Sequence, residues 1–171
     1  MEVVIVESAE EVAKVAAGVI AGVIRSRKAK GGSAAIGVAT GSSPLGTYRE
    51  LAALVDAGEL DVEGVSAFAL DEYVGIAKEH PESYHTVIAR NVTEPLGLDP
   101  ALVHVPDGLA EDIDAACEGY ERQIAAAGGV DIQLLGIGAN GHVGFNEPTS
   151  SLASRTRLKT LAPRTRADNA R

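Results

Sequence analysis

The chain has 171 residues, and its 15 basic and 24 acidic side chains give a formal net charge of −9. Hydrophobic residues make up 46% of the sequence and charged residues 23%, a balance typical of globular rather than disordered proteins. The length suits a single domain. The acidic excess argues against a nucleic-acid partner, which usually requires a basic stripe, and no apolar run approaches the ~20 residues needed to span a membrane.

The single cysteine, Cys117, cannot form a disulfide within the chain. It falls in the apolar register of a predicted helix, so we expect it to be buried. A lone cysteine is typical of a reducing compartment. The first residues also lack the basic region and cleavage site of a secretory signal, and together these features predict a cytoplasmic protein.

The first third of the chain begins with a β-branched run at residues 3–6, which predicts a strand. Ser8 and Glu11 then stand at the spacing of a capping box, which predicts a helix from this point to about Arg27. Apolar residues recur along it at helical spacing and should face the core. They are Val12, Val15, Ala16, Val19, Ile20 and Val23.

The rest of the chain alternates apolar runs with amphipathic stretches. Strands are predicted at residues 34–38, 65–70, 102–105 and 132–137, and helices after Pro44, within 79–92 and over 111–127. Continuous apolar strands that alternate with helices predict an α/β fold: a three-layer, doubly wound, Rossmann-like and mostly parallel sheet with helices on both faces. Ligands of such folds bind outside the carboxyl ends of the strands, and polar segments follow several of these strands.

The first polar segment is Thr40-Gly41-Ser42-Ser43-Pro44, between a predicted strand and a predicted helix. Glycine lets the backbone approach a ligand closely, and hydroxyls with free amides at a helix N-terminus favour an anion such as phosphate. Ser43 could equally serve as a plain helix cap. The Lys and glycine spacings of the P-loop and of the dinucleotide fingerprint are missing.

The second polar segment, Asp71-Glu72-Tyr73, directly follows the strand predicted at 65–70. A carboxylate at the carboxyl end of a strand is well placed for general acid–base chemistry, although a solvated turn or a cap would use the same residues. Neighbouring side chains leave a strand in different directions, so only one carboxylate need face the crevice. Asp71 comes first and is the better candidate.

The third and densest segment, residues 138–148, places Asn140, His142 and Glu147 among glycines. A histidine with a nearby carboxylate has its tautomer fixed and its pKa raised, the usual arrangement of a proton-transfer pair. A metal site is the rival hypothesis, but His142 and Glu147 are the only local ligands and the spacing is not that of an HExxH motif. A purely structural loop is the other alternative.

Taken together, these segments resemble the glucosamine-6-phosphate deaminase family, and the likeness runs through the whole chain in the right order. Its carriers are residues 39–44, 70–75, 80–84, 141–148 and 150–157. The resemblance implies a hydrolase with an isomerase step that converts glucosamine 6-phosphate and water to fructose 6-phosphate and ammonia in N-acetylglucosamine catabolism. It also implies that a small sugar phosphate is the partner and that no cofactor or metal is needed.

The resemblance assigns roles by position. Asp71 matches the general base that moves a proton between C2 and C1, His142 the group that opens the pyranose ring, and Glu147 the carboxylate that orients and charges that histidine. Asn140 stands where some members have Asp, so it can hold His142 by hydrogen bonding without adding charge. The phosphate-binding positions are Gly41, Ser42, Ser43 and Arg171.

A basic stretch follows the third segment, and a solvated surface would explain it. The resemblance offers another reading, because some of its residues match positions that bind the activator N-acetylglucosamine 6-phosphate between subunits of allosteric bacterial members. These are Ser150, Arg157, Lys159 and Thr160, and they imply a homo-oligomer. Family members continue beyond the position of Arg171, so we expect a single domain, residues 1–171, that is incomplete at its C-terminus.

Two other functions are weighed against this one. A 6-phosphogluconolactonase-like hydrolase has the same broad fold and a Gly–His pair, but usually lacks the continuation at residues 145–148. A non-catalytic sugar-phosphate sensor domain tends to lose the base and the histidine and to carry a DNA-binding module. Asp71 and His142 are both present, and residues 1–33 predict no helix-turn-helix, so both alternatives rank below the deaminase.

Overall fold

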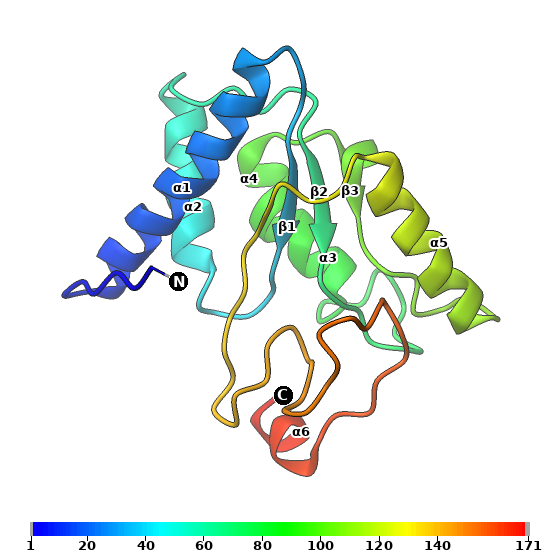
Figure 1. Ribbon diagram of the computed structural model, residues 1–171. Coiled ribbons are helices and arrows are strands. Elements are labelled where there is room, and N and C mark those ends of the chain that lie inside the picture. The colour runs from blue at the N-terminus through cyan, green and yellow to red at the C-terminus, as the bar shows by residue number, and fades with distance from the viewer. Residues whose placement is uncertain (1, 170–171) are drawn as a thin grey trace.

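A parallel sheet of four short strands forms the centre of the structure, a computed structural model that describes residues 2–169 (Figure 1). The strands are β1 Ala35–Val38, β2 Ser66–Ala69, β3 Val103–His104 and β4 Ile132–Gln133, in the order β3-β2-β1-β4. Ile36 of β1 pairs with Ala67 of β2 and with Ile132 of β4. All pairs are parallel, so the predicted sheet type is confirmed.

Helices pack on both faces of this sheet, which confirms the predicted three layers. The helical segments are α1 Ala9–Ala29, α2 Leu45–Asp56, α3 Tyr84–Ile88, the π-turn η1 Ala89–Thr93, α4 Glu94–Leu96, the 3-10 turn η2 Pro100–Leu102, α5 Ile113–Ala126 and α6 Pro163–Asn169. Ile36 and Ala67 join the core beneath α1 to α4, while Ala35 and Phe68 pack against Tyr120 of α5. None of the helices in residues 2–169 combines the length and the apolar character of a membrane-spanning segment.

Two buried tyrosines fix the carboxyl ends of the central strands. The Tyr48 hydroxyl of α2 accepts a hydrogen bond from the Ala39 amide (2.9 Å) and donates one to the Ala39 carbonyl (2.8 Å). The Tyr120 hydroxyl of α5 donates to the Ala69 carbonyl (2.7 Å). Because these bonds satisfy buried backbone groups, β1 and β2 end at fixed points, and the polar segments that follow begin from a rigid base.

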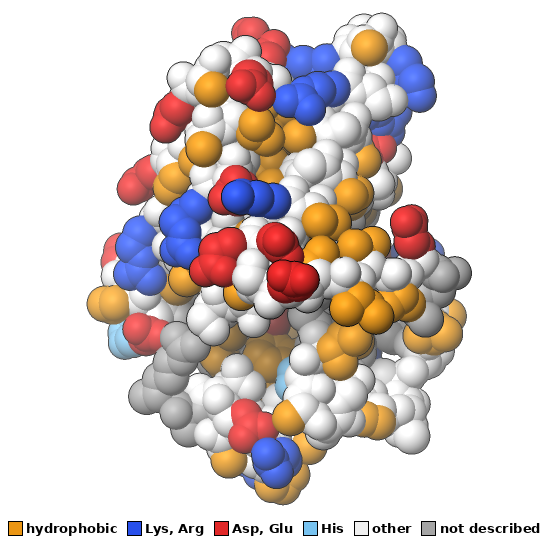
Figure 2. All heavy atoms as spheres, turned by 90° about the vertical axis from the view of Figure 1, so that its left-hand side faces the viewer, with side chains coloured by type: hydrophobic (Ala, Val, Ile, Leu, Met, Phe, Trp, Pro, Cys, Tyr) orange, Lys and Arg blue, Asp and Glu red, His pale blue; other side chains and the backbone are white. Residues whose placement is uncertain are grey.

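Helix α1 begins as predicted, because the Ser8 hydroxyl accepts a hydrogen bond from the Glu11 amide. The predicted apolar face is wrong except at Ile20, which is buried: Val12 and Val19 are 56% exposed, and Figure 2 shows hydrophobic side chains among the charged ones on this side of the molecule. Small residues dominate the buried face, because α1 lies so close to α2 that a Cβ on Gly46 would come within 2.9 Å of the Ala13 side chain. The buried face is Ala13, Ala17, Ile20, Ala21 and Ile24.

Two strand predictions are also corrected. Residues 3–6 form no strand, and Ile5 is 91% exposed, because no strand edge within residues 2–169 pairs with this segment. The strand predicted at 132–137 shrinks to β4, and Ile137 is 80% exposed. By the register of β1 with β4, the last residue of β1, Val38, stands opposite Leu134, so residues 135–137 have no partner in β1. Cys117 is half-buried rather than buried.

Candidate active site

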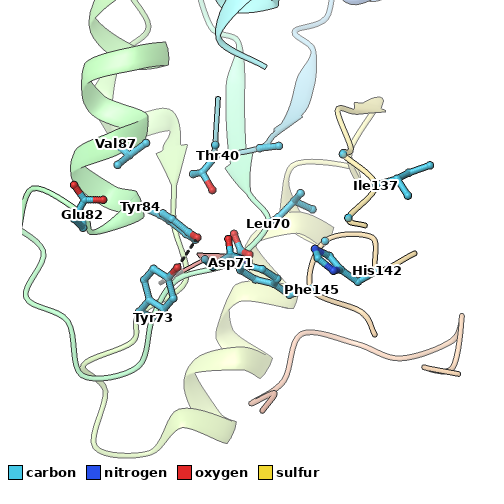
Figure 3. A pocket seen from close by; sticks show the side chains of 16 residues that line it. Thr40, Leu70, Asp71, Tyr73, Glu82, Tyr84, Val87, Ile137, His142 and Phe145 are labelled. Atoms are coloured by element: carbon cyan, nitrogen blue, oxygen red, sulfur yellow. Dashed lines mark hydrogen bonds between the residues drawn. The ribbon is translucent and has the colours of Figure 1, made fainter. Parts of the chain in front are cut away.

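The polar segments at the carboxyl ends of β1, β2 and β4 meet around one cavity of about 460 Å³ (Figure 3). Each segment supplies part of the wall, and the residues concerned include Thr40, Gly41, Asp71, Tyr73, Gly138 and His142. This placement confirms that sequence segments far apart converge on one crevice. The expected reason also holds, since parallel strands bring their carboxyl ends to one edge of the sheet.

Asp71 and Glu72 leave β2 in different directions, as predicted. The Glu72 carboxylate accepts hydrogen bonds from the backbone amides of Tyr73 (2.8 Å), Tyr84 (3.1 Å) and His85 (3.0 Å), and so anchors the start of α3. Asp71 faces the cavity. Burial, together with the nearby negative charge of Glu72, raises the pKa of Asp71 to about 7. Asp71 can therefore gain and release a proton near neutral pH.

Tyr73 and Tyr84 form a wall beside Asp71 that the sequence analysis did not assign to the site (Figure 3). Their rings lie 4.9 Å apart, and the Tyr84 hydroxyl donates to the Tyr73 hydroxyl over 3.0 Å. Burial raises the pKa of Tyr84, so its hydroxyl stays protonated. Tyr73 follows Asp71 by two residues, and this spacing on an extended segment is a signal that could have placed both on one side.

His142 is held by Asn140 rather than by a carboxylate. The Asn140 Oδ1 atom lies 2.7 Å from Nδ1 of His142 and accepts a hydrogen bond from the His142 amide over 3.1 Å. A backbone N–H can only donate, so the oxygen of Asn140 must face His142. Nδ1 then carries the ring proton, and Nε2 keeps a free lone pair.

Glu147 forms its hydrogen bond with Asn140 rather than with the His142 ring, and its charge acts on His142 from behind that amide. Its Oε2 atom accepts a hydrogen bond from Asn140 Nδ2 (2.7 Å), and its Oε1 atom accepts one from the Ala162 amide (2.9 Å). The Ala162 amide is the main cause of its lowered pKa, followed by Thr165, Asn140 and His142. Glu147 therefore stays ionised and polarises the Asn140 amide.

The backbone of this loop is shaped to let His142 reach the cavity. A Cβ on Gly138 would overlap the imidazole of His142, so only glycine leaves room for the ring. Phe145 adopts a left-handed conformation with φ of 55°, which costs energy for a non-glycine residue, and its ring centre lies 5.7 Å from that of His142. In residues 2–169, no three His, Cys, Asp or Glu side chains gather as a metal site would need.

The segment proposed for phosphate lies at the rim of the cavity. Gly41 has φ of 98° and lines the cavity, whereas Ser42 and Ser43 are exposed beside it. The alternative that Ser43 caps the next helix is wrong, because Pro44 occupies the cap position of α2 and no side chain bonds there. The two hydroxyls are thus open to a ligand. Arg171 lies outside the described residues.

The residues predicted to bind an activator are only partly brought together. Arg157, Lys159 and Thr160 line a second cavity of about 620 Å³, which shares Asp71 and Phe145 with the first. Ser150 is not among the residues that line it, and within residues 2–169 its buried hydroxyl has no hydrogen-bond partner.

Known proteins resemble this chain along its whole length. A family model described as glucosamine-6-phosphate isomerases/6-phosphogluconolactonase matches residues 7–165. A glucosamine-6-phosphate deaminase of Cutibacterium acnes is 58% identical, and one of Pseudarthrobacter chlorophenolicus is 55% identical, each over 171 residues. Both comparisons cover 100% of this chain, but the chain spans only 64% of the length of either relative.

Solved structures share the fold. A monomeric glucosamine-6-phosphate deaminase is 39% identical with a TM-score of 0.93, and the match covers 99% of this chain and 69% of that one. The 6-phosphogluconolactonase of Plasmodium vivax has a TM-score of 0.68 at 20% identity, over 83% of this chain and 50% of that one, a likeness of fold alone. The chain therefore belongs to the family of glucosamine-6-phosphate isomerases and 6-phosphogluconolactonases.

Proposed function

We propose that this chain carries the chemical groups of a glucosamine-6-phosphate deaminase, which converts glucosamine 6-phosphate and water to fructose 6-phosphate and ammonia. The observation that carries the proposal is that Asp71 and His142, from two different strand ends, line the same cavity. The naming of relatives that are 58% and 55% identical as deaminases supports the same reaction.

His142 is proposed to open the sugar ring. Because Asn140 holds the proton on Nδ1, the Nε2 lone pair is available to take the proton of the anomeric hydroxyl. The resulting imidazolium returns a proton to the ring oxygen, which leaves the open-chain aldehyde. The ionised Glu147, placed behind Asn140, favours this transient positive charge.

Asp71 is proposed to carry the isomerisation. As a carboxylate it removes the proton from C2 of the open-chain sugar, and as a carboxylic acid, which can exchange its proton with solvent, it delivers a proton to C1. A pKa of about 7 suits both halves of the step, because the group must change protonation state within one turnover. The step leaves an imine at C2, and addition of water there expels ammonia. C2 is oxidised and C1 is reduced within the same molecule, so no external oxidant or reductant is needed and the residues named here suffice without a cofactor.

Gly41, Ser42 and Ser43 are proposed to hold the substrate phosphate together with Arg171. Support comes from the exposed hydroxyls, the glycine backbone at the cavity rim and the start of α2 behind them. Fixing the phosphate at one end would orient C1 and C2 at Asp71, which is the entropic part of catalysis.

Ammonia release from glucosamine 6-phosphate tests the proposal. Asp71→Asn is expected to abolish release but leave sugar-phosphate binding measurable, because the base is lost and the anchor is not. His142→Gln is expected to slow ring opening and to spare reaction from the open-chain form in part. Wild-type ammonia release from Asp71→Asn would contradict the assignment of the base. Hydrolysis of 6-phosphogluconolactone without ammonia release would favour the lactonase.

We also propose that a homo-oligomer binds N-acetylglucosamine 6-phosphate as an activator through Ser150, Arg157, Lys159 and Thr160. The shared cavity of the last three supports it, and cations beside a hydroxyl suit a phosphate. Sugar affinity should rise with the activator, and hyperbolic kinetics unchanged by it would contradict the proposal. Because the solved relative is described as monomeric, sedimentation should first measure whether this chain forms an oligomer.

We also propose a cytoplasmic location, which the lone cysteine supports.

A further inference from the structure

Thr165 is a buried polar residue to which the mechanism above gives no part. It lies on α6, and only 1% of its surface is exposed. Its hydroxyl accepts a hydrogen bond of 3.1 Å from Asn140 Nδ2, although 25 residues separate the two in the sequence. Figure 1 shows α6 next to the loop that follows β4. Buried hydroxyls are costly unless they are bonded, so this contact has a physical reason to persist.

The Asn140 amide uses its whole hydrogen-bonding capacity. Its nitrogen donates one proton to Glu147 (2.7 Å) and the other to Thr165 (3.1 Å), and its oxygen accepts from both nitrogen donors of His142. An amide offers two donors and two acceptor sites. With all of them occupied, the amide has one favourable orientation, and the Nδ1 proton of His142 has one acceptor.

We propose that Thr165 is a positioning residue: its hydroxyl fixes the Asn140 amide and thereby holds His142 in the Nδ1–H form with Nε2 free to serve the cavity. The hydroxyl also helps to keep the pKa of Glu147 below its usual value, so it acts on both groups behind the histidine. The kinetic consequence rests on the proposed function, whereas the tautomer of His142 is a property of the chain itself.

Removing the Thr165 hydroxyl should weaken the hold on the Asn140 amide. One amide proton of Asn140 would lose its acceptor in a buried place, which is unfavourable. The amide could then rotate away from His142 to find another partner. His142 would lose its single acceptor and populate the Nε2–H form, in which the catalytic nitrogen carries a proton and cannot accept one.

The test compares Thr165→Val, which keeps the shape but not the hydroxyl, with Thr165→Ser, which keeps the hydroxyl but not the methyl group. Nitrogen-15 NMR of the histidine-labelled 171-residue chain reports the tautomer of His142 without any substrate. The unmodified chain and Thr165→Ser should show a protonated Nδ1. Thr165→Val should show a markedly larger Nε2–H population, and Thr165→Ala replaces it if the valine variant does not unfold cooperatively.

An unchanged His142 tautomer in Thr165→Val would overturn the proposal, and so would an equal loss in Thr165→Ser, which would point to packing of the methyl group. In the ammonia assay, Thr165→Val should lower kcat about ten-fold with little change in KM, and Thr165→Ser should restore it. If neither the unmodified chain nor the variants release ammonia, the proposed function fails, but the NMR comparison still decides the role of Thr165.

Discussion

The side-chain oxygen of Asn140 lies 2.7 Å from Nδ1 of His142, so a neutral amide occupies the place where a carboxylate would stand in a conventional Asp–His pair. The amide fixes the tautomer of the histidine but adds no negative charge to it. The negative charge comes from Glu147, which contacts the far side of the Asn140 amide. This arrangement separates the orientation of the imidazole from its electrostatic stabilisation.

Asn140→Asp should therefore change the titration of His142. The new carboxylate would face the imidazole directly, and an opposite charge at this distance favours the protonated ring, so the protonated form of His142 is expected to persist to higher pH than in the unmodified chain. NMR titration measures this change. Asn146→Asp is the matched control, because Asn146 lies on the same loop but contacts Arg157. Identical titration of His142 in Asn140→Asp and the unmodified chain would contradict the assigned contact.

Asp71 should make the fold less stable as the pH rises. Its pKa is about 7 in the folded chain against 3.8 for an unperturbed aspartate, so between these values the folded state holds a proton that the unfolded state has lost. The free energy of unfolding then falls as pH rises, by an upper bound of about 4 kcal/mol across this range. Asp71→Asn should stabilise the chain at pH 8 and have little effect at pH 4. Equal melting-temperature changes at both pH values would refute this account.

Glu72 should matter to Asp71 through charge as well as through structure. Glu72→Gln keeps the side-chain shape but removes the negative charge that helps to raise the pKa of Asp71, so that pKa should fall. Charge-assisted bonds to the amides at the start of α3 weaken as well, at a cost of about 1–2 kcal/mol. Carbon-13 NMR of the Asp71 carboxyl and urea unfolding measure the two effects. Glu82→Gln is a control, because it removes a carboxylate elsewhere on the cavity wall.

Parallel topology explains what the sequence could predict of the site. Once apolar runs and helices alternate, the carboxyl ends of the strands must share one edge, so Asp71 and His142 could be placed in one crevice before the structure was known. The separation of Glu72 from Asp71 followed from the alternation of side chains along a strand. Both arguments depend only on the local sequence pattern and on the fold class, and not on contacts between residues far apart in the sequence.

The parts that could not be predicted depend on distant packing. Apolar residues occur on several faces of α1, so periodicity alone does not show which face is buried. The close approach of Gly46 to Ala13 determines the buried face. The β-branched run at residues 3–6 favours extended backbone, but composition cannot say whether a strand edge is available. Thr165 contacts Asn140 although it lies 25 residues downstream, and no sequence pattern near either residue predicts that contact.

Paired substitutions on α1 test its corrected orientation. Ile24 is 0% exposed. Ile24→Ala should lower the free energy of unfolding by about 2–5 kcal/mol, because the truncation leaves a cavity. Val19 is 56% exposed, and Val19→Ser should change stability by no more than about 0.5 kcal/mol. Urea unfolding measures both. A larger loss from Val19→Ser than from Ile24→Ala would restore the face first predicted from periodicity.

The central claim is that Asp71 removes the C2 proton of a sugar phosphate, and exchange of that proton with solvent measures this step most directly. The chain is incubated with glucosamine 6-phosphate in deuterium oxide, and proton NMR follows the C2 signal of the remaining substrate relative to its C1 signal. Exchange should occur with the unmodified chain and fall to the uncatalysed rate with Asp71→Asn, while Glu82→Gln should exchange normally. Exchange by Asp71→Asn at the rate of the unmodified chain would contradict the account.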